Sequence, residues 1–158
     1  MQLERIVSGG QTGVDRGALD AAIMLSIPHG GWCPLGRLAE DGTIPRKYKL
    51  HETTSPEYPV RTEQNVIDSD GTLILYRHRL FGGTYLTRRL CRKHRRPVIS
   101  VDLNADDDQD VQRVRQWLQG HEIRVLNLAG PRESSSPGIA RETKEFLRRL
   151  LANADEAS

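Results

Sequence analysis

The residues Ser8-Gly9-Gly10-Gln11-Thr12-Gly13-Val14-Asp15 connect an apolar run, Ile6-Val7, to a helical pattern that starts near Val14. A strand that passes through a glycine turn into a helix surrounds an anion with backbone N–H groups, and the helix dipole favours the negative charge. The three glycines allow the backbone to come close to a ligand, and Thr12 adds a hydroxyl donor. The stretch therefore predicts a ligand-binding turn; the alternative is a tight turn that holds no ligand.

Two known phosphate-binding patterns are absent from this turn. A Walker-type ATPase has Lys and then Ser or Thr after the last glycine, but Val14-Asp15 follows Gly13 here. The glycines at positions 9, 10, 13 and 17 also fail to match the G-x-G-x-x-G pattern of dinucleotide-binding proteins. The turn therefore predicts an anion site, but its pattern does not identify the ligand.

The composition indicates one globular domain. The chain has 158 residues, of which 37% are hydrophobic and 28% charged, and we assign residues 1–152 to the domain and 153–158 to a frayed tail. Only two cysteines are present, and neither a signal-peptide core nor an 18-residue apolar run occurs, so we expect a cytoplasmic protein without a membrane partner. A formal net charge of +2 does not by itself indicate nucleic-acid binding.

Strand and helix patterns alternate along the whole chain. This alternation predicts an α/β fold, a Rossmann-like three-layer sandwich with a mostly parallel sheet of about six strands and helices on both faces. The apolar run 71–76 is the clearest strand, because it is typical of a strand buried on both faces. We expect strands at 5–8, 29–32, 49–53, 71–76, 97–101 and 123–128, and helices at 14–26, 55–68, 82–95, 106–120 and 136–151, the last with Ser136 as its N-cap.

A strand order of 3-2-1-4-5-6 would place strands one and four side by side at the switch point, where such sheets bind ligands. The turn Gly9–Gly13 would then lie beside the second glycine turn, Gly82-Gly83-Thr84. The loop that contains Gly130 would open on the same edge of the sheet. Glycine turns that converge on one crevice predict a binding site there.

Several charged side chains lie near this expected crevice. Arg37, Glu40 and Asp41 belong to a long connection that either reaches the ligand or forms a solvated turn. Asp15 would repel a phosphate, so we expect it to cap the first helix or to accept a hydrogen bond from a ribose or from a pterin N–H. Arg132 with Ser134 predicts an anion clamp at a helix start, and a polar capping loop is the alternative.

The histidines and cysteines do not indicate a metal site. The five histidines share no metal-ligand spacing, and Cys33 and Cys91 are too few for a metal framework. We therefore predict no metal bound by the protein itself. Arginines and lysines crowd residues 88–96, at a helix end where cations complement the dipole, and aromatic residues make up only 5% of the chain, so we expect no nucleic-acid partner.

Four ordered segments resemble the putative molybdenum carrier family of the SLOG superfamily. They are Ser8–Asp20, Gly31-Trp32-Cys33-Pro34 with Gly36–Gly42, Gly82-Gly83-Thr84 with Leu86-Thr87, and Asn127–Ser134. The superfamily also contains molybdenum cofactor carrier proteins and LOG-type nucleoside monophosphate phosphoribohydrolases. The resemblance implies a Rossmann-like fold, a homo-oligomer (dimer or tetramer), and a ligand that is the molybdenum cofactor, another phosphorylated pterin or a nucleotide. The expected binding residues are Gly9, Gly10, Gln11, Thr12, Gly13, Asp15, Arg37, Gly82, Gly83, Thr84, Gly130, Arg132 and Ser134.

One departure bears on catalysis. LOG-type hydrolases resemble P-G-G-x-G-T-x-x-E at the second glycine turn, whereas residues 81–88 of this chain contain no acidic residue. A hydrolase would have to use Glu40, Asp41 or Asp15 instead. The sequence therefore favours a carrier, and the alternatives are a nucleotide N-glycosidic hydrolase and a nucleotide-sensing module without turnover.

Overall fold

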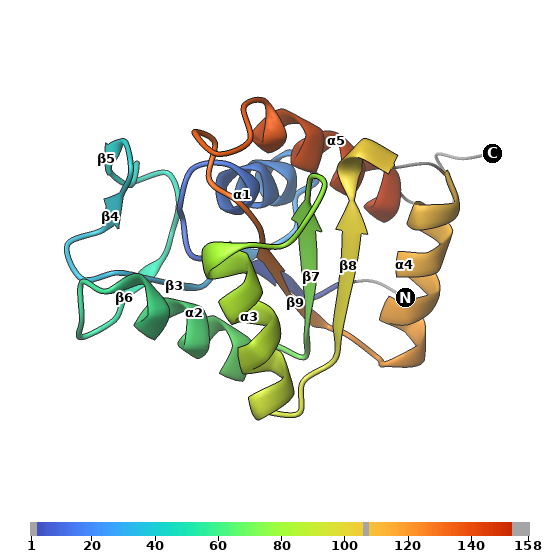
Figure 1. Cartoon of the computed structure of the whole chain (residues 1–158), viewed down its shortest axis with the longest axis horizontal. Helices are drawn as coiled ribbons and strands as arrows, with labels where there is room; N and C mark the ends of the chain where they lie inside the picture. The colour runs from blue at the N-terminus through green and yellow to red at the C-terminus, as the bar shows by residue number, and fades with distance from the viewer. Residues whose placement is uncertain (1–2, 106–107, 153–158) are drawn as a thin grey trace.

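The computed structural model of the protein describes residues 3–105 and 108–152, so the expected frayed tail and the expected first two residues of the fourth helix lie outside the described residues. A five-stranded parallel sheet forms the centre of the molecule (Figure 1). Its order is β2-β1-β9-β7-β8, with β1 at Arg5–Val7, β2 at His29–Gly30, β7 at Gly71–Tyr76, β8 at Val98–Asp102 and β9 at Val125–Ala129.

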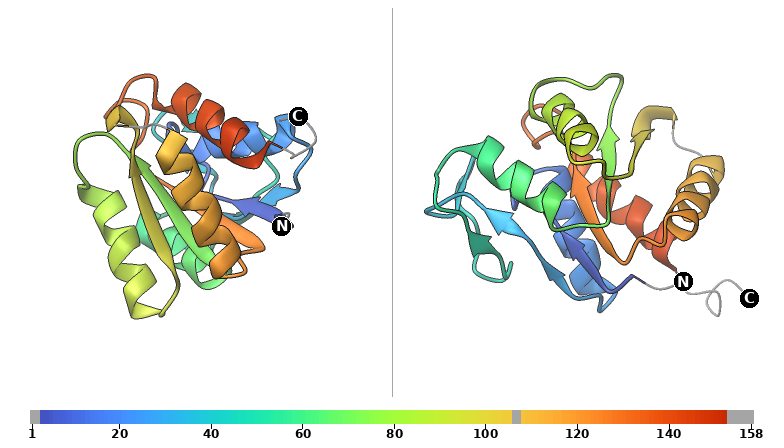
Figure 2. Two further views of the ribbon diagram at one scale, coloured as in Figure 1. Left: turned by 90° about the vertical axis from the view of Figure 1, so that its right-hand side faces the viewer. Right: turned by 90° about the horizontal axis from the view of Figure 1, so that it is seen from below.

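Helices cover both faces of this sheet, as two further views show (Figure 2). On one face α1 (Val14–Met24), α4 (Asp108–Gly120) and α5 (Ile139–Leu151) share a single hydrophobic core with the strands. On the other face α2 (Tyr58–Ile67) packs against α3 (Gly82–Lys93). The predicted Rossmann-like α/β sandwich is confirmed.

Successive side chains of β7 point to opposite faces of the sheet, so they contribute to different sides of the buried interior. Leu73 and Leu75 are fully buried with the apolar stripes of α1, α4 and α5. Thr72 is also fully buried, and its hydroxyl accepts a hydrogen bond of 3.1 Å from the Asn127 side chain of the neighbouring strand. A buried polar pair that satisfies itself across two strands fixes their register without the cost of an unpaired donor.

The assumed strand order 3-2-1-4-5-6 is wrong, because β9 lies between β1 and β7. Leu126 and Leu128 of β9 are almost completely buried, at 0% and 1% exposure. An edge strand leaves one side open, whereas two strand neighbours and helices on both faces are needed to bury these leucines. The crevice is therefore formed over β9 and β7 rather than over β1 and β7.

The end of the expected second strand and the expected third strand form a separate small sheet beside the central one. The second strand is divided at Gly31 into β2 and β3 (Trp32–Cys33), and β3 pairs in parallel with β6 (His51–Glu52). The long connection contains an antiparallel hairpin, β4 (Leu38–Ala39) with β5 (Gly42–Thr43), which the sequence pattern did not predict. Two-residue strands are too short to show the alternation on which strand prediction depends.

The last helix begins later than predicted. Gly138, with φ 87°, is its N-cap, and the helix starts at Ile139 rather than after Ser136. Glu133 explains the difference, because its carboxylate accepts hydrogen bonds from the backbone N–H groups of Gly138 and Ala140. A glutamate in the preceding loop thus does the capping that the sequence assigned to a serine.

No helix among residues 3–105 and 108–152 is long and apolar enough to span a membrane.

Gly17 allows α1 to approach α5 closely, and this contact gives a test of the fold. A Cβ atom at Gly17 would lie 2.4 Å from the carbonyl oxygen of Ala140. We expect Gly17→Ala to lower the free energy of unfolding by about 1–3 kcal/mol, because overpacking outweighs the helix propensity gained. Gly120→Ala is the matched control, because no atom lies within 4 Å of its added methyl group. Urea unfolding in which both variants match the wild type would contradict this packing.

Candidate functional site

The loops that follow β1, β7 and β9 meet at the carboxyl edge of the sheet and line a cleft of about 350 Å³. The strands β1 and β2 lie on one side of β9, and β7 and β8 lie on the other side. The direction in which the chain adds strands therefore reverses between β9 and β7, and such a reversal opens a crevice at the carboxyl edge of the sheet. The volume lies within the range of small-molecule sites, at its lower end. All three predicted loops thus contribute to one cleft.

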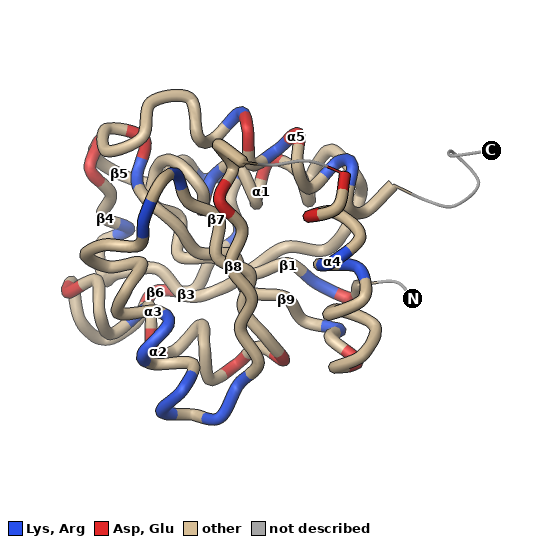
Figure 3. The backbone as a smooth tube through the Cα atoms, turned by 45° about the vertical axis from the view of Figure 1, so that its right-hand side comes forward, with Lys and Arg blue, Asp and Glu red and all other residues tan. Residues whose placement is uncertain are grey.

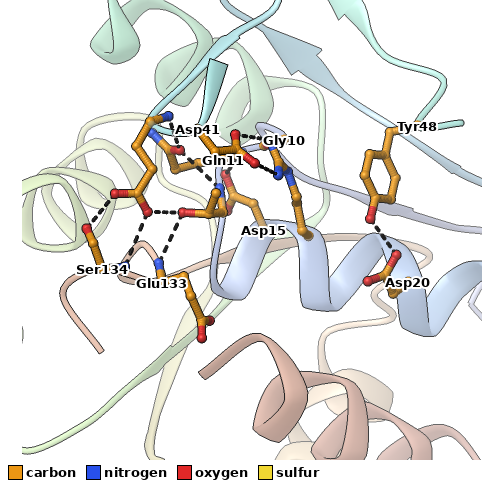
Figure 4. Close-up of polar contacts among 11 residues, drawn as sticks. Gly10, Gln11, Asp15, Asp20, Asp41, Tyr48, Glu133 and Ser134 are labelled. Carbon is orange, nitrogen blue, oxygen red and sulfur yellow. Dashed lines mark hydrogen bonds and ion pairs between the residues drawn. The ribbon is translucent and has the colours of Figure 1, made fainter. Parts of the chain in front are cut away.

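The first glycine turn already holds an anion of its own chain. Asp15 accepts a hydrogen bond of 3.1 Å from the backbone N–H of Gln11 (Figure 4), and the backbone of Gly9 also stabilises its charged form. Gly10 and Gly13 have φ angles of 81° and 80°, and Cβ atoms there would collide with Ile44 and with the carbonyl of Pro131. These glycines pack the turn against neighbouring loops. Two of the backbone donors predicted for a phosphate are thus paired within the chain, Gln11 N with Asp15 and Thr12 N with the side chain of Gln11.

Asp15 is the single acidic residue among the described residues that line the cleft. It is 7% exposed, and this burial raises the pKa of its carboxyl to about 6. The positive charges of Arg61 and Arg16 and the two backbone hydrogen bonds oppose the increase but do not cancel it. A cleft carboxyl whose pKa lies near neutrality is able to exchange a proton with a ligand.

Arg61 lies in the wall of the cleft and was missed by the sequence analysis. It is 8% exposed, donates from Nη1 to the carbonyl oxygen of Gly9 at 3.0 Å, and stacks 5.0 Å from the ring centre of Tyr58. The buried face of α2 consists of Arg61, Asn65 and Val66. Two polar residues at positions i and i+4 on the buried stripe of a helix are the pattern that could have identified it.

The second glycine turn remains open. Gly82 has φ 54°, and no heavy atom lies within 4 Å of a Cβ built at Gly82 or Gly83. Both glycines and Thr84 line the cleft where α3 begins, and no side chain caps this helix. Backbone N–H groups at an uncapped helix start are free to bind an anion.

The third loop adds Gly130, Arg132 and Ser134 to the cleft wall. Arg132 is exposed, and with Arg61 it gives the cleft two guanidinium groups against one carboxyl. Gln11 also lies in the wall and is 6% exposed. Its side-chain oxygen accepts hydrogen bonds from the backbone N–H groups of Thr12 and Glu40. Its Nε2 has no hydrogen-bond partner among the described residues. An unpaired buried donor is costly unless a ligand or water pairs with it.

Glu40 and Asp41 do not line the cleft. Glu40 accepts hydrogen bonds from the hydroxyl groups of Thr12 and Ser134 and from the backbone N–H of Ser134 at 3.2 Å. The hydrogen bonds from Ser134 and then from Thr12 hold the pKa of Glu40 below its usual range.

Asp41 forms an ion pair with Arg16, with 2.7 Å between Oδ1 and Nη2, and Arg16 in turn donates to the carbonyl oxygen of Gly10. Arg37 also lies outside the lining of the cleft. Its guanidinium donates to three carbonyl oxygens of its own loop, those of Ile44, Pro45 and Tyr48. Arg16, Arg37 and Asp41 thus hold the long connection in place.

The remaining polar clusters lie elsewhere. Lys and Arg gather toward the far end of α3 (Figure 3), where Lys93 pairs with Glu63 at 3.0 Å. This end of the helix is opposite the end that borders the cleft. Within the described ranges, no group of three or more His, Cys, Asp and Glu side chains is arranged to hold a metal ion.

The raised pKa of Asp15 predicts a pH dependence of stability. Between about pH 4 and pH 6 the unfolded chain has lost this proton while the folded chain retains it, so stability falls as the pH rises through this window. A pKa shift of about two units corresponds to a change of about 3 kcal/mol in the free energy of unfolding across this pH window. Asp15→Asn removes this pH dependence, because an amide does not titrate. Urea unfolding at several pH values should show the wild type losing this much relative to the variant between pH 4 and pH 7. Parallel profiles would contradict the buried carboxyl.

Comparisons with known proteins agree with this fold. The circularly permutated YpsA SLOG family matches residues 6–151 of the chain. The crystal structure of a putative molybdenum carrier protein from Syntrophus aciditrophicus is similar to it with a TM-score of 0.93 and 44% sequence identity, over 95% of this chain and 96% of that one. No curated protein matches the chain. The chain therefore belongs to the circularly permutated YpsA SLOG family.

Proposed function

We propose that this protein binds a small phosphorylated heterocycle in the cleft and serves as a carrier of the molybdenum cofactor, with a nucleotide as the alternative ligand. The observation that carries the proposal is the composition of the cleft wall: two guanidinium groups and an uncapped helix start surround about 350 Å³ at the carboxyl edge of a parallel sheet. The name of the similar protein from Syntrophus aciditrophicus supports molybdenum as the cargo.

Each part of such a ligand has a counterpart in the cleft. Arg132 supplies positive charge for a phosphate, and the start of α3 supplies backbone donors for other oxygens of the ligand. Phe81 lines the cleft with 45% of its surface exposed, which suits stacking on a planar ring. Asp15 as acceptor and Gln11 Nε2 as unpaired donor suit the polar edge of a heterocycle.

The homo-oligomer expected from the family resemblance stays a prediction.

Binding of GMP, AMP and a phosphorylated pterin, measured by calorimetry, tests this proposal. We expect Gly83→Val and Arg132→Ala each to weaken binding about 10- to 100-fold, because one fills the approach to the α3 start and the other removes a charged donor. Gly83 is chosen over Gly10, since a side chain at Gly10 would collide with Leu50 and Ile44 and disturb the fold.

Gly120→Ala is the control, because Gly120 is not among the residues that line the cleft. Each variant is first shown to melt cooperatively. If the two cleft variants bind all three ligands as tightly as the wild type, the proposed site is wrong. Mass spectrometry of protein purified from its own host should show a copurified phosphorylated compound.

A nucleotide N-glycosidic hydrolase is the second candidate, and the raised pKa of Asp15 favours it, because a carboxyl that titrates near pH 6 is suited to acid–base catalysis. We nevertheless expect the wild type to release no free base from nucleoside monophosphates over many hours, since Asp15 is committed to the first glycine turn. Chromatography of the reaction mixture measures this. Release that Asp15→Asn lowers by about 10²- to 10⁴-fold would assign the protein to the hydrolases instead.

A further inference from the structure

The carboxylate of Glu40 lies in a set of donors that its own segment does not provide. The hydroxyl of Thr12 comes from the loop after β1, and the hydroxyl and N–H of Ser134 come from the loop after β9. The hydrogen bonds from Ser134 and Thr12 are the main causes that lower the pKa of Glu40. The positive charge of Arg132 lowers it further. Glu40 is therefore ionised at neutral pH.

These donors are held in place without Glu40. The backbone N–H of Glu133 donates to Thr12 Oγ1 at 3.1 Å, which leaves the Thr12 hydroxyl hydrogen free to point at the carboxylate. Ser134 and Arg132 belong to a loop that the carboxylate of Glu133 fixes to the start of α5. Two hydroxyl groups and one N–H group that converge on a point, with the charge of a guanidinium nearby, form an anion site.

The position adjoins the cleft, because Ser134, which donates to Glu40, also lines the cleft, as does Arg132. Glu40 itself is exposed and contributes no atom to the lining of the cleft. The hairpin that bears it has other attachments, namely the bond from Glu40 N to Gln11 Oε1 at 2.9 Å and the ion pair of Asp41 with Arg16. A rotation of the Glu40 side chain alone would therefore vacate the donors.

We propose that Thr12, Ser134 and Arg132 form an oxyanion subsite of the cleft, and that the Glu40 carboxylate is an internal occupant which the phosphate of a phosphate monoester, or a free tetrahedral oxyanion, displaces. This inference rests on the proposed function, since it gives the phosphate of the ligand a place. A phosphate dianion has more charge and more acceptor oxygens than a carboxylate, so it gains more from the same donors. Glu40 is then a competitor rather than the catalytic acid considered from the sequence.

Removal of a competitor raises affinity, whereas removal of a merely structural side chain lowers it or leaves it unchanged. The apparent affinity of a ligand is reduced by the fraction of molecules whose site is free. If Glu40 occupies the subsite in about nine molecules of ten, Glu40→Ala should bind GMP about 10-fold more tightly than the wild type. Binding of guanosine, which has no phosphate, should not change.

Calorimetry with GMP, guanosine, inorganic phosphate and molybdate, on the wild type and on Glu40→Ala, Glu40→Gln and Asp41→Asn, measures these differences. Asp41→Asn is the matched control, because it removes the same charge one residue away and breaks an ion pair outside the cleft. We expect it to change GMP affinity by less than about 3-fold, as is usual for an exposed charge. Glu40→Gln should give a smaller gain than Glu40→Ala, and Glu40→Ala combined with Ser134→Ala should lose the gain.

A GMP affinity of Glu40→Ala equal to or below that of the wild type overturns this inference, as does an equal gain in Asp41→Asn. If GMP binds to the wild type and only the gain is missing, the proposed function stands and the subsite alone is wrong. If neither protein binds GMP, the phosphorylated pterin or any of the oxyanions, both proposals are contradicted. Binding of phosphate or molybdate to Glu40→Ala supports a subsite for the free oxyanion, and a gain confined to GMP supports one for a phosphate monoester.

Discussion

The carboxyl edge of the sheet depends on one interaction, the hydrogen bond that the buried carboxylate of Asp15 accepts from the backbone of the first glycine turn. It ties Gln11 to the first turn of α1 and so fixes the path of the chain from β1 into that helix. Its burial is costly, as the pKa of about 6 shows, and Arg61 and Arg16 offset part of that cost. Because Asp15 takes the N–H of Gln11, that donor is not open to another anion.

The same principle recurs at Glu40. Two of the positions where this fold offers donors to an anion are occupied by carboxylates of the chain itself, one buried and one exposed. The difference in burial separates their roles, because an exposed carboxylate leaves its donors by rotation alone, whereas Asp15 would need the turn to open. Donors and carboxylates at this edge are therefore paired within the protein itself.

The strand order explains why the chain's first glycine turn is not the open one. If the strands are numbered from β9, the sheet β2-β1-β9-β7-β8 becomes 3-2-1-4-5, the central order of a dinucleotide-binding fold. In that numbering the loop of Gly130, Arg132 and Ser134 follows strand one and leads into the first helix, α5. This loop has the place that the phosphate-binding turn has in such folds, in agreement with the description of the family as circularly permutated.

The sequence by itself determined the alternation of strands and helices, the buried strand at residues 71–76 and the three glycine loops, because hydrophobic periodicity and glycine turns are local properties. The tertiary structure alone decided that β9 lies between β1 and β7, since pairing depends on which strands bury each other's leucines. It also decided the partners of Asp15, Glu40 and Asp41. All three look alike as acidic residues near glycines. Glu40 and Asp41 take their partners from segments distant in sequence, and Asp15, which bonds within its own turn, meets Arg61 of α2 only in the folded chain.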